Sequence, residues 1–147
     1  MLESRKDQDY IELMQHVDES FRTHLKSFCE ALVCQPERGE LLSLLGNLST
    51  QLHLHFELEE RDGYLGEAVE IAPRFSVEAD RLLQQHAVLS EEVTALMDRV
   101  RVDDESESWW SEFVPQAEMF VRKLIEHEKL ENKLVQDAYE EDIGDKD

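Results

Sequence analysis

The feature that most constrains how this chain can fold is an apolar stripe that recurs four times, each time with one histidine in it. Apolar residues three or four positions apart lie on one face of an α-helix, so each stripe predicts an amphipathic helix. The predicted helices cover about residues 8–34, 40–61, 76–101 and 111–139, within one domain of residues 1–147 that ends in an acidic tail, 140–147. Four such helices with short connections predict an all-α fold, an antiparallel up-down four-helix bundle.

The breaks between the stripes place the helix ends. Pro36 and Gly39 separate the first two helices, and the polar, acidic run 102–108 separates the last two. Pro115 suits a helix only in its first turn, which places the start of the last helix near Ser111. The connection between the second and third helices is long, so a short helical turn is expected around Glu67 to Ile71.

The charge balance excludes two classes of partner. The 147 residues include 35 acidic and 15 basic side chains, which gives a net charge of −20. A strongly negative surface repels phosphate, so neither nucleic acid nor an anionic membrane is expected as a partner. The sequence shows no secretory signal and no apolar run of the ~20 residues that a membrane span needs. With Cys29 and Cys34 interpreted as reduced thiols, the expected location is the cytoplasm.

Two of the stripes continue into a histidine that a glutamate follows one turn later, His55 with Glu59 and His127 with Glu131. Residues four apart lie one above the other on a helix, so imidazole and carboxylate both point into the predicted core. A buried carboxylate needs a cation or a metal, and neutral imidazole binds divalent metals. One histidine on each of the other two stripes completes the pattern and predicts a buried metal site. The candidate metal ligands are His24, His55, Glu59, His86, His127 and Glu131.

The choice of His24 as the ligand from the first helix rests on its direction around the helix. At about 100° per residue, His24 lies about 55° from the mean direction of its stripe, whereas His16 lies more than about 120° away. Height along the helix favours His16 instead, because His16 and His55 are at similar distances from the loop that joins their helices. A loop can absorb one turn, but a side chain cannot point through its own helix. His24 is therefore the predicted ligand, and His16 is the alternative.

Three common metal sites are missing from the sequence. The ferritin-type di-iron site uses Glu-x-x-His, and no histidine here has a glutamate three residues before it. The zinc-protease motif His-Glu-x-x-His would need a histidine where Glu131 stands. The cysteine-rich pattern of structural zinc sites is also missing.

The combined pattern of histidines and glutamates resembles the hemerythrin-like, or HHE cation-binding, family over essentially the whole chain. The motif from His55 to Glu60, followed by Gly63-Tyr64, is similar to the second-helix signature of that family. The segment from Leu124 to Asn132 is similar to its fourth-helix signature. The resemblance implies a hemerythrin-like bundle whose cofactor is a pair of non-haem iron ions. It also implies the ligand roles: Glu59 and Glu131 bridge the irons, His24 and His55 hold one iron, and His86 and His127 hold the other.

The sequence departs from the oxygen carriers of that family in two ways. Their third helix has two histidines one turn apart, but Leu82 and Ser90 flank His86 at that spacing. Their fourth-helix carboxylate is an aspartate five residues after the histidine, whereas Glu131 comes four residues after it. The iron near His86 is therefore expected to lack one protein ligand, which water, Tyr64 or another glutamate replaces. The glutamates expected on solvated helix faces are Glu57, Glu126 and Glu128, with Glu60 as the exception.

The resemblance implies a protein that binds dioxygen or a related small ligand such as nitric oxide. Sensing, storage or scavenging of oxygen, nitric oxide or iron would all suit such a domain. Two alternatives remain open: a di-iron enzyme of the oxidase or peroxidase type, and a structural or interaction bundle whose histidines are only buried. An enzyme needs an acid or base near the open metal position, and no unassigned histidine lies on the predicted core face. The sequence predicts no catalytic residue and identifies no protein partner.

Overall fold

The computed structural model describes the backbone of residues 2–61, 64–102 and 106–145, and the side chains of residues 16–60, 65–102 and 106–141. Within these ranges the chain is helical and contains no strand, so the predicted all-α class is confirmed. Four helices are long and one is short, which is compatible with a four-helix bundle. The elements are α1 (Leu2–Cys34), α2 (Arg38–Arg61), α3 (Tyr64–Ile71), the 3₁₀ turn η1 (Pro73–Phe75), α4 (Ser76–Arg101) and α5 (Trp109–Asp145).

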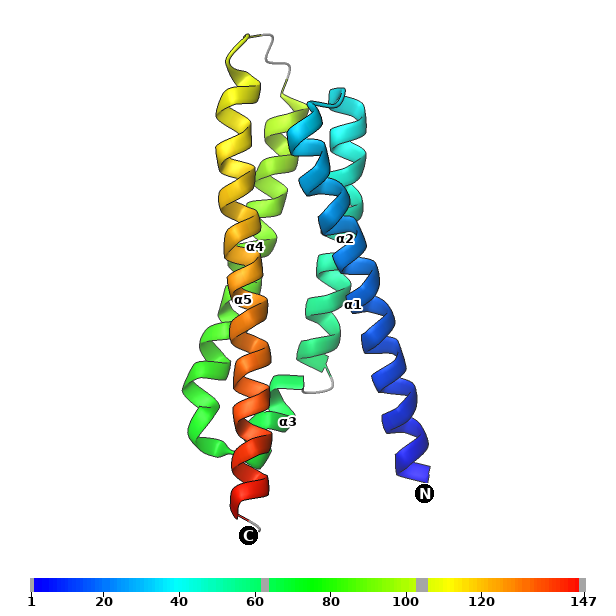
Figure 1. Cartoon of the computed structure of the whole chain (residues 1–147), viewed down its shortest axis with the longest axis vertical. Helices are drawn as coiled ribbons and strands as arrows, with labels where there is room; N and C mark the ends of the chain where they lie inside the picture. Colours follow the sequence, from blue (N-terminus) through cyan, green and yellow to red (C-terminus); the bar gives the residue numbers. More distant parts are fainter. Residues whose placement is uncertain (1, 62–63, 103–105, 146–147) are drawn as a thin grey trace.

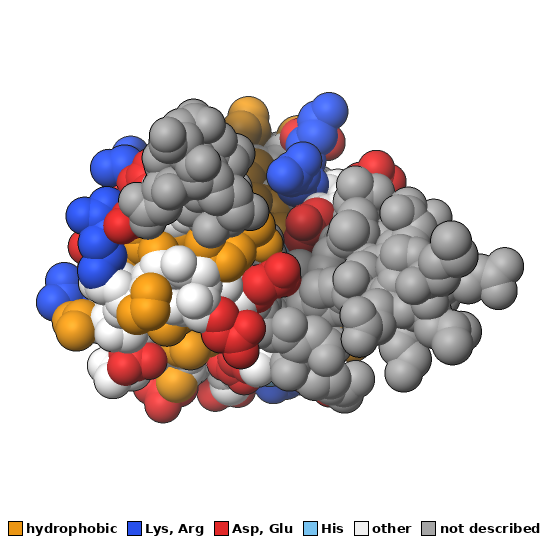
Figure 2. Space-filling model, turned by 90° about the horizontal axis from the view of Figure 1, so that it is seen from below, with side chains coloured by type: hydrophobic (Ala, Val, Ile, Leu, Met, Phe, Trp, Pro, Cys, Tyr) orange, Lys and Arg blue, Asp and Glu red, His pale blue; other side chains and the backbone are white. Residues whose placement is uncertain are grey.

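The four long helices lie side by side along the long axis of the molecule (Figure 1). Helix α1 packs on α2, α2 packs on α4, and α4 packs on α5, while α3 packs mainly against α5. Both termini lie at one end, and from that end hydrophobic side chains are visible between acidic and basic ones (Figures 1 and 2). Over the residues that the structure describes, no helix is both long enough and apolar enough to cross a bilayer.

Three of the predicted helix ends are those of the structure, at residues 34, 61 and 101. Helix α1 ends because Gln35 adopts a positive φ of 50°, and its amide donates to the carbonyl of Ala31 at 3.1 Å. A residue in this left-handed conformation commonly closes a helix, and Pro36 then follows outside it. The short helix expected around Glu67 to Ile71 is also present, as α3.

Helix α5 begins at Trp109, at the early end of the range Trp109 to Glu112 that the sequence predicts and two residues before the preferred start near Ser111. Pro115 consequently lies inside the helix, beyond its first turn. A proline has no amide hydrogen, so the carbonyl of Ser111, four residues earlier, receives no helical hydrogen bond from it. Pro115 is exposed, so water can reach this carbonyl, and the helix continues without a break. At its other end α5 extends to Asp145 and includes most of the predicted acidic tail.

Among the described residues, two large apolar clusters fill most of the interior, and a polar layer separates them. Along α4, His86 lies between Leu82 of the smaller cluster and Leu89 of the larger one, and α5 repeats this order with His127 and Glu131. The larger cluster takes side chains from all four long helices, among them Phe21, Phe28, Leu45, Leu52, Phe56, Val93, Phe113 and Phe120. The smaller cluster joins α3, η1, α4 and α5 through Leu65, Ala68, Ala72, Phe75, Ala79, Leu82, Leu134 and Ala138.

Candidate metal centre

Three helices supply the polar layer with buried histidines, and two of them add a glutamate one turn later. His55 and Glu59 come from α2, His86 comes from α4, and His127 and Glu131 come from α5. Each of these five residues is 3% exposed or less. The His55 Nε2 atom lies 2.6 Å from Glu59 Oε1, and His127 Nε2 contacts Glu131 Oε1. Both predicted pairs therefore form and both are buried.

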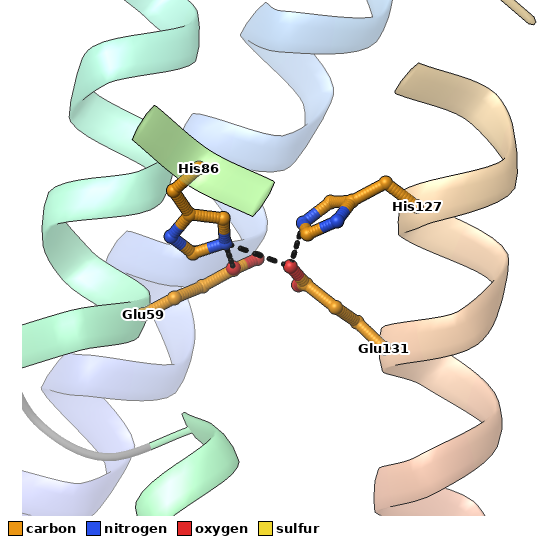
Figure 3. A group of neighbouring side chains, drawn as sticks. All are labelled: Glu59, His86, His127 and Glu131. Atoms are coloured by element: carbon orange, nitrogen blue, oxygen red, sulfur yellow. Dashed lines mark hydrogen bonds and ion pairs between the residues drawn. The ribbon is translucent and has the colours of Figure 1, made fainter. Parts of the chain in front are cut away.

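His86 joins the two pairs into one cluster. Its Nε2 atom lies 2.8 Å from Glu131 Oε1 and 3.3 Å from Glu59 Oε2 (Figure 3). All three histidines therefore turn Nε2 toward the same two carboxylates. A single polar cluster thus connects α2, α4 and α5 at one level of the molecule.

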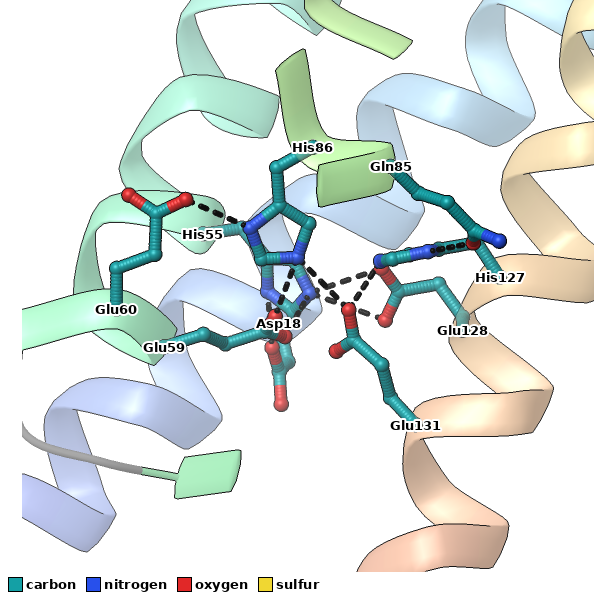
Figure 4. Close-up of polar contacts among 9 residues, drawn as sticks. All are labelled: Asp18, His55, Glu59, Glu60, Gln85, His86, His127, Glu128 and Glu131. Carbon is teal, nitrogen blue, oxygen red and sulfur yellow. Dashed lines mark hydrogen bonds and ion pairs between the residues drawn. The ribbon is translucent and has the colours of Figure 1, made fainter. Parts of the chain in front are cut away.

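The opposite ring nitrogen, Nδ1, of each histidine contacts a side-chain oxygen farther out (Figure 4). Carboxylate and amide oxygens accept hydrogen bonds, so these contacts favour a hydrogen on Nδ1, and a metal ion that displaced the proton of Nε2 would find that nitrogen directed inward. Metal-binding histidines in proteins typically have such an outer partner. The outer contacts are Asp18–His55 at 2.8 Å, an ion pair without hydrogen-bond alignment, and the hydrogen bonds Glu60–His86 at 2.9 Å and Gln85–His127 at 2.8 Å.

Aromatic packing fixes the planes of these imidazoles. The ring of Phe56 stacks on His86 with centroids 3.8 Å apart, and it meets the edge of His127 at 5.7 Å. Phe21 of α1 stacks on His55 at 5.2 Å, with only 9° between the ring planes. Close packing of this kind limits side-chain rotation, so the histidines are held in orientation before any ligand binds.

The inward-facing atoms form two groups that could each hold a metal ion. Within each group, the potential ligand atoms lie within 4.8 Å of one another. Both groups contain Glu59 and Glu131, so the two carboxylates lie where they can be shared by two ions. The first group is Glu59, His86, His127 and Glu131, and the second is His55, Glu59, Glu128 and Glu131.

The electrostatics of the cluster show how it balances the charge of its carboxylates when no metal ion is bound. Burial alone would lower the pKa of His55, but nearby carboxylates, Asp18 first, raise it to about 12. Burial also opposes the charge on His86, and its carboxylate neighbours, Glu131 first, raise its pKa to about 10. Burial raises the pKa of Glu59 to about 7, with a further contribution from Glu131. Burial acts in the same direction on Glu131, but its contacts with histidines hold its pKa well below the usual range.

Several buried atoms at the centre of the cluster have charged neighbours but no aligned hydrogen bond. Among the described residues, these atoms include Oε2 of Glu59, Nε2 of His127 and Oε2 of Glu131. A buried polar atom that makes no hydrogen bond destabilises a fold by about 1–3 kcal/mol. Metal ligation would use these same lone pairs, and the set of imidazole and carboxylate donors suits iron, manganese or zinc. The residues present therefore fit a metal site.

Of the six predicted ligands, the structure brings together five, and His24 is the exception. The His24 side chain is half-buried, and its Nδ1 atom lies 2.7 Å from the carbonyl oxygen of Ser20 on its own helix. His24 belongs to neither group of potential ligands. The alternative, His16, is exposed. The side chain of Tyr64, a predicted replacement ligand, lies outside the described residues.

Glu128 is the potential ligand that the sequence analysis missed. It is half-buried, and both of its carboxylate oxygens lie 3.0 Å from His55 Nε2. Its assignment to a solvated face is wrong because Glu128 follows His127 by one residue, about 100° around the helix from the buried stripe. That direction faces α1 and α2, which the periodicity of one helix cannot reveal. The expected exception, Glu60, contacts Nδ1 of His86 at 2.9 Å, although its side chain is 51% exposed.

Comparisons of the chain with models of known protein families, with curated proteins and with solved structures find no match. The geometry of the cluster therefore carries the functional conclusion. At its most general, the conclusion is that this helical protein has a buried group of histidines and glutamates that could bind a metal ion.

Proposed function

We propose that this chain is a hemerythrin-like protein that holds a non-haem di-iron centre and binds dioxygen or a related small ligand such as nitric oxide. The observation that carries the proposal is the sharing of Glu59 and Glu131 between two groups of potential ligands. Two ions that share carboxylates make better use of this set than one tetrahedral ion, which needs only four ligands.

The arrangement of the helices supports the same proposal. An antiparallel up-down bundle is part of it, and in Figure 1 the sequence colours run in alternating directions along successive long helices. Such bundles place metal sites in the core, with ligands from facing helices. The proposed ligands are His55, Glu59, His86, His127, Glu128 and Glu131. The cytoplasmic location stays a prediction of the sequence.

The chemistry that a bound di-iron centre supplies is a change of oxidation state coupled to binding of a small ligand. The residues of the chain contribute orientation and charge. The outer partners Asp18, Glu60 and Gln85 hold the imidazoles with Nε2 inward. The apolar clusters on both sides of the polar layer restrict the access of water.

The test is metal analysis of protein purified without chelators and loaded with ferrous iron in the absence of air. We expect about two irons per chain, from the count of ligand groups. We also expect the absorption spectrum to change on exposure to air. A reproducible value of one iron, or tight zinc binding with no uptake of iron, would contradict the di-iron proposal. Absence of any metal would favour the alternative of a structural bundle with buried histidines.

A further inference from the structure

A cleft between α1 and α5 leads from the surface to one side of the polar cluster that connects α2, α4 and α5. The cleft has a volume of about 250 Å³, and its walls include His55, Glu59 and Glu128. Helices α1 and α5 pack less on each other than α1 does on α2 or α5 does on α4. In Figure 1 they diverge toward the end where the termini lie.

We propose that this cleft is the entrance through which a small ligand from solvent reaches the metal centre, passing the carboxylate of Glu128. The inference rests on the proposed function. It adds the route and the residues that line it.

The position of Glu128 supports this assignment. Its side chain is 23% exposed, whereas those of Glu59 and Glu131 are 1% and 0% exposed. Glu128 is therefore the one potential carboxylate ligand with a substantial solvent-facing surface. Because it comes from α5 and contacts His55 of α2, it lies across the inner end of the cleft.

The walls of the cleft also indicate what can pass. Phe21, Leu25 and Leu124 supply apolar surface, and Arg22 and Lys129 supply positive charge. In a chain with a net charge of −20, these two cations partly offset the carboxylates of Asp18, Glu59 and Glu128 in the same cleft, which reduces the local repulsion of an anion. The volume is more than large enough for a ligand of a few atoms, such as dioxygen, nitric oxide or azide.

A groove between α4 and α5 is the rival route. It has a larger volume, about 450 Å³, but His127 is the one potential metal ligand among its lining residues. The Nδ1 side of His127, opposite its inward nitrogen, is bonded to Gln85, which also lines this groove. The groove between α4 and α5 therefore meets the cluster at the back of one imidazole, whereas the cleft between α1 and α5 meets three potential ligands.

Two matched residues of α5 separate these routes. Ile125 lines the cleft and Leu130 lines the rival groove, and both are 41% exposed. The probe is azide, added to the iron-loaded, air-oxidised protein, and the rate of the absorbance change is followed by stopped flow. Ile125→Trp fills the cleft, so we expect azide to bind at least about tenfold more slowly. Leu130→Trp should change the rate less than about twofold.

Ile125→Ala provides a variant with the opposite expectation, because widening the cleft should speed azide binding. It keeps the test decisive if the tryptophan variant does not fold. Slowing by Leu130→Trp with no effect of the Ile125 variants would overturn the proposal in favour of the rival groove. No effect of any variant would overturn it as well. Iron content, measured for every sample, distinguishes these results from failure of the di-iron proposal itself, in which the wild-type protein would not hold about two irons per chain.

Discussion

Glu128 and Glu126 are neighbouring glutamates of α5 whose environments differ. Glu128 is half-buried and contacts His55, whereas Glu126 is exposed. Replacing Glu128 with Gln keeps the size of the side chain but removes the charge that a metal ligand supplies. We expect the iron content of Glu128→Gln to fall from about two toward one per chain, since the second group loses one of its two unshared ligands.

The measurement is an anaerobic ferrous iron titration of Glu128→Gln beside Glu126→Gln. The second variant makes the same change in charge on the same helix, so it should bind iron like the wild type. Equal losses in both variants would mean that the effect is one of overall charge. In that case Glu128 would not be a metal ligand.

His24 provides a second test at the scale of one residue. Its ring is held against the Ser20 carbonyl of its own helix and lies outside both groups. His24→Ala should therefore retain about the wild-type iron content, whereas His55→Ala should lose the metal of the second group. Loss of iron in His24→Ala would instead support the prediction made from the sequence. It would also show that the imidazole turns inward when metal binds.

The five buried residues of the cluster could be predicted from the sequence because burial follows the helical period. The stripes that place Leu89 and Leu124 in the larger apolar cluster also place His86 and His127 in the polar layer. Glu128 could not be predicted in this way, because its role depends on the contact between α5 and a histidine of α2. Contacts between helices, unlike buried faces, leave no periodic signal in the sequence of one helix.

At the scale of the elements, the position of Pro115 in α5 can be tested by its effect on stability. If α5 starts at Trp109, Pro115 lies in the helix interior, where proline is about 3 kcal/mol less favourable than alanine. Proline also restricts the unfolded chain, which offsets about 0.4–1 kcal/mol of that difference. We expect Pro115→Ala to raise the free energy of unfolding by about 2–2.6 kcal/mol in urea melts.

Gln116→Ala is the matched control, because Gln116 is also exposed and differs little from alanine in helix propensity. It should change the free energy of unfolding by a few tenths of a kcal/mol. If Pro115→Ala is no more stable than the wild type, Pro115 lies in a first helical turn. The start near Ser111 that the sequence predicts would then be the better description.

At the scale of the whole molecule, metal and fold are coupled through the protons of the cluster. The folded state holds the pKa of His55 near 12 and that of His86 near 10, above the ordinary value of 6.5. Their contributions to stability are complete below about pH 6.5 and are lost as the pH rises through these values. The pKa of Glu59 is raised from 4.5 to about 7, so its contribution to stability is also lost as the pH rises between those values. The lowered pKa of Glu131 acts in the opposite direction, and its contribution is lost as the pH falls below about 4.5.

The metal-free protein should therefore be most stable in mildly acidic solution and lose stability as the pH rises from about 4.5 to about 10 and above. Metal binding requires neutral imidazoles and ionised carboxylates, so it releases protons and strengthens as the pH rises. At a free metal concentration 100 to 1,000 times the dissociation constant, the bound metal should add about 3–4 kcal/mol to the free energy of unfolding.

Thermal melts with and without ferrous iron, kept anaerobic, should show a gap in Tm that widens from pH 6 to pH 8. In Glu59→Gln the metal-free protein should lose less stability over this range, because the amide does not ionise beside Glu131. A gap that narrows with pH, or a Glu59→Gln melt that follows the wild type at every pH, would mean that the two carboxylates do not share one buried site.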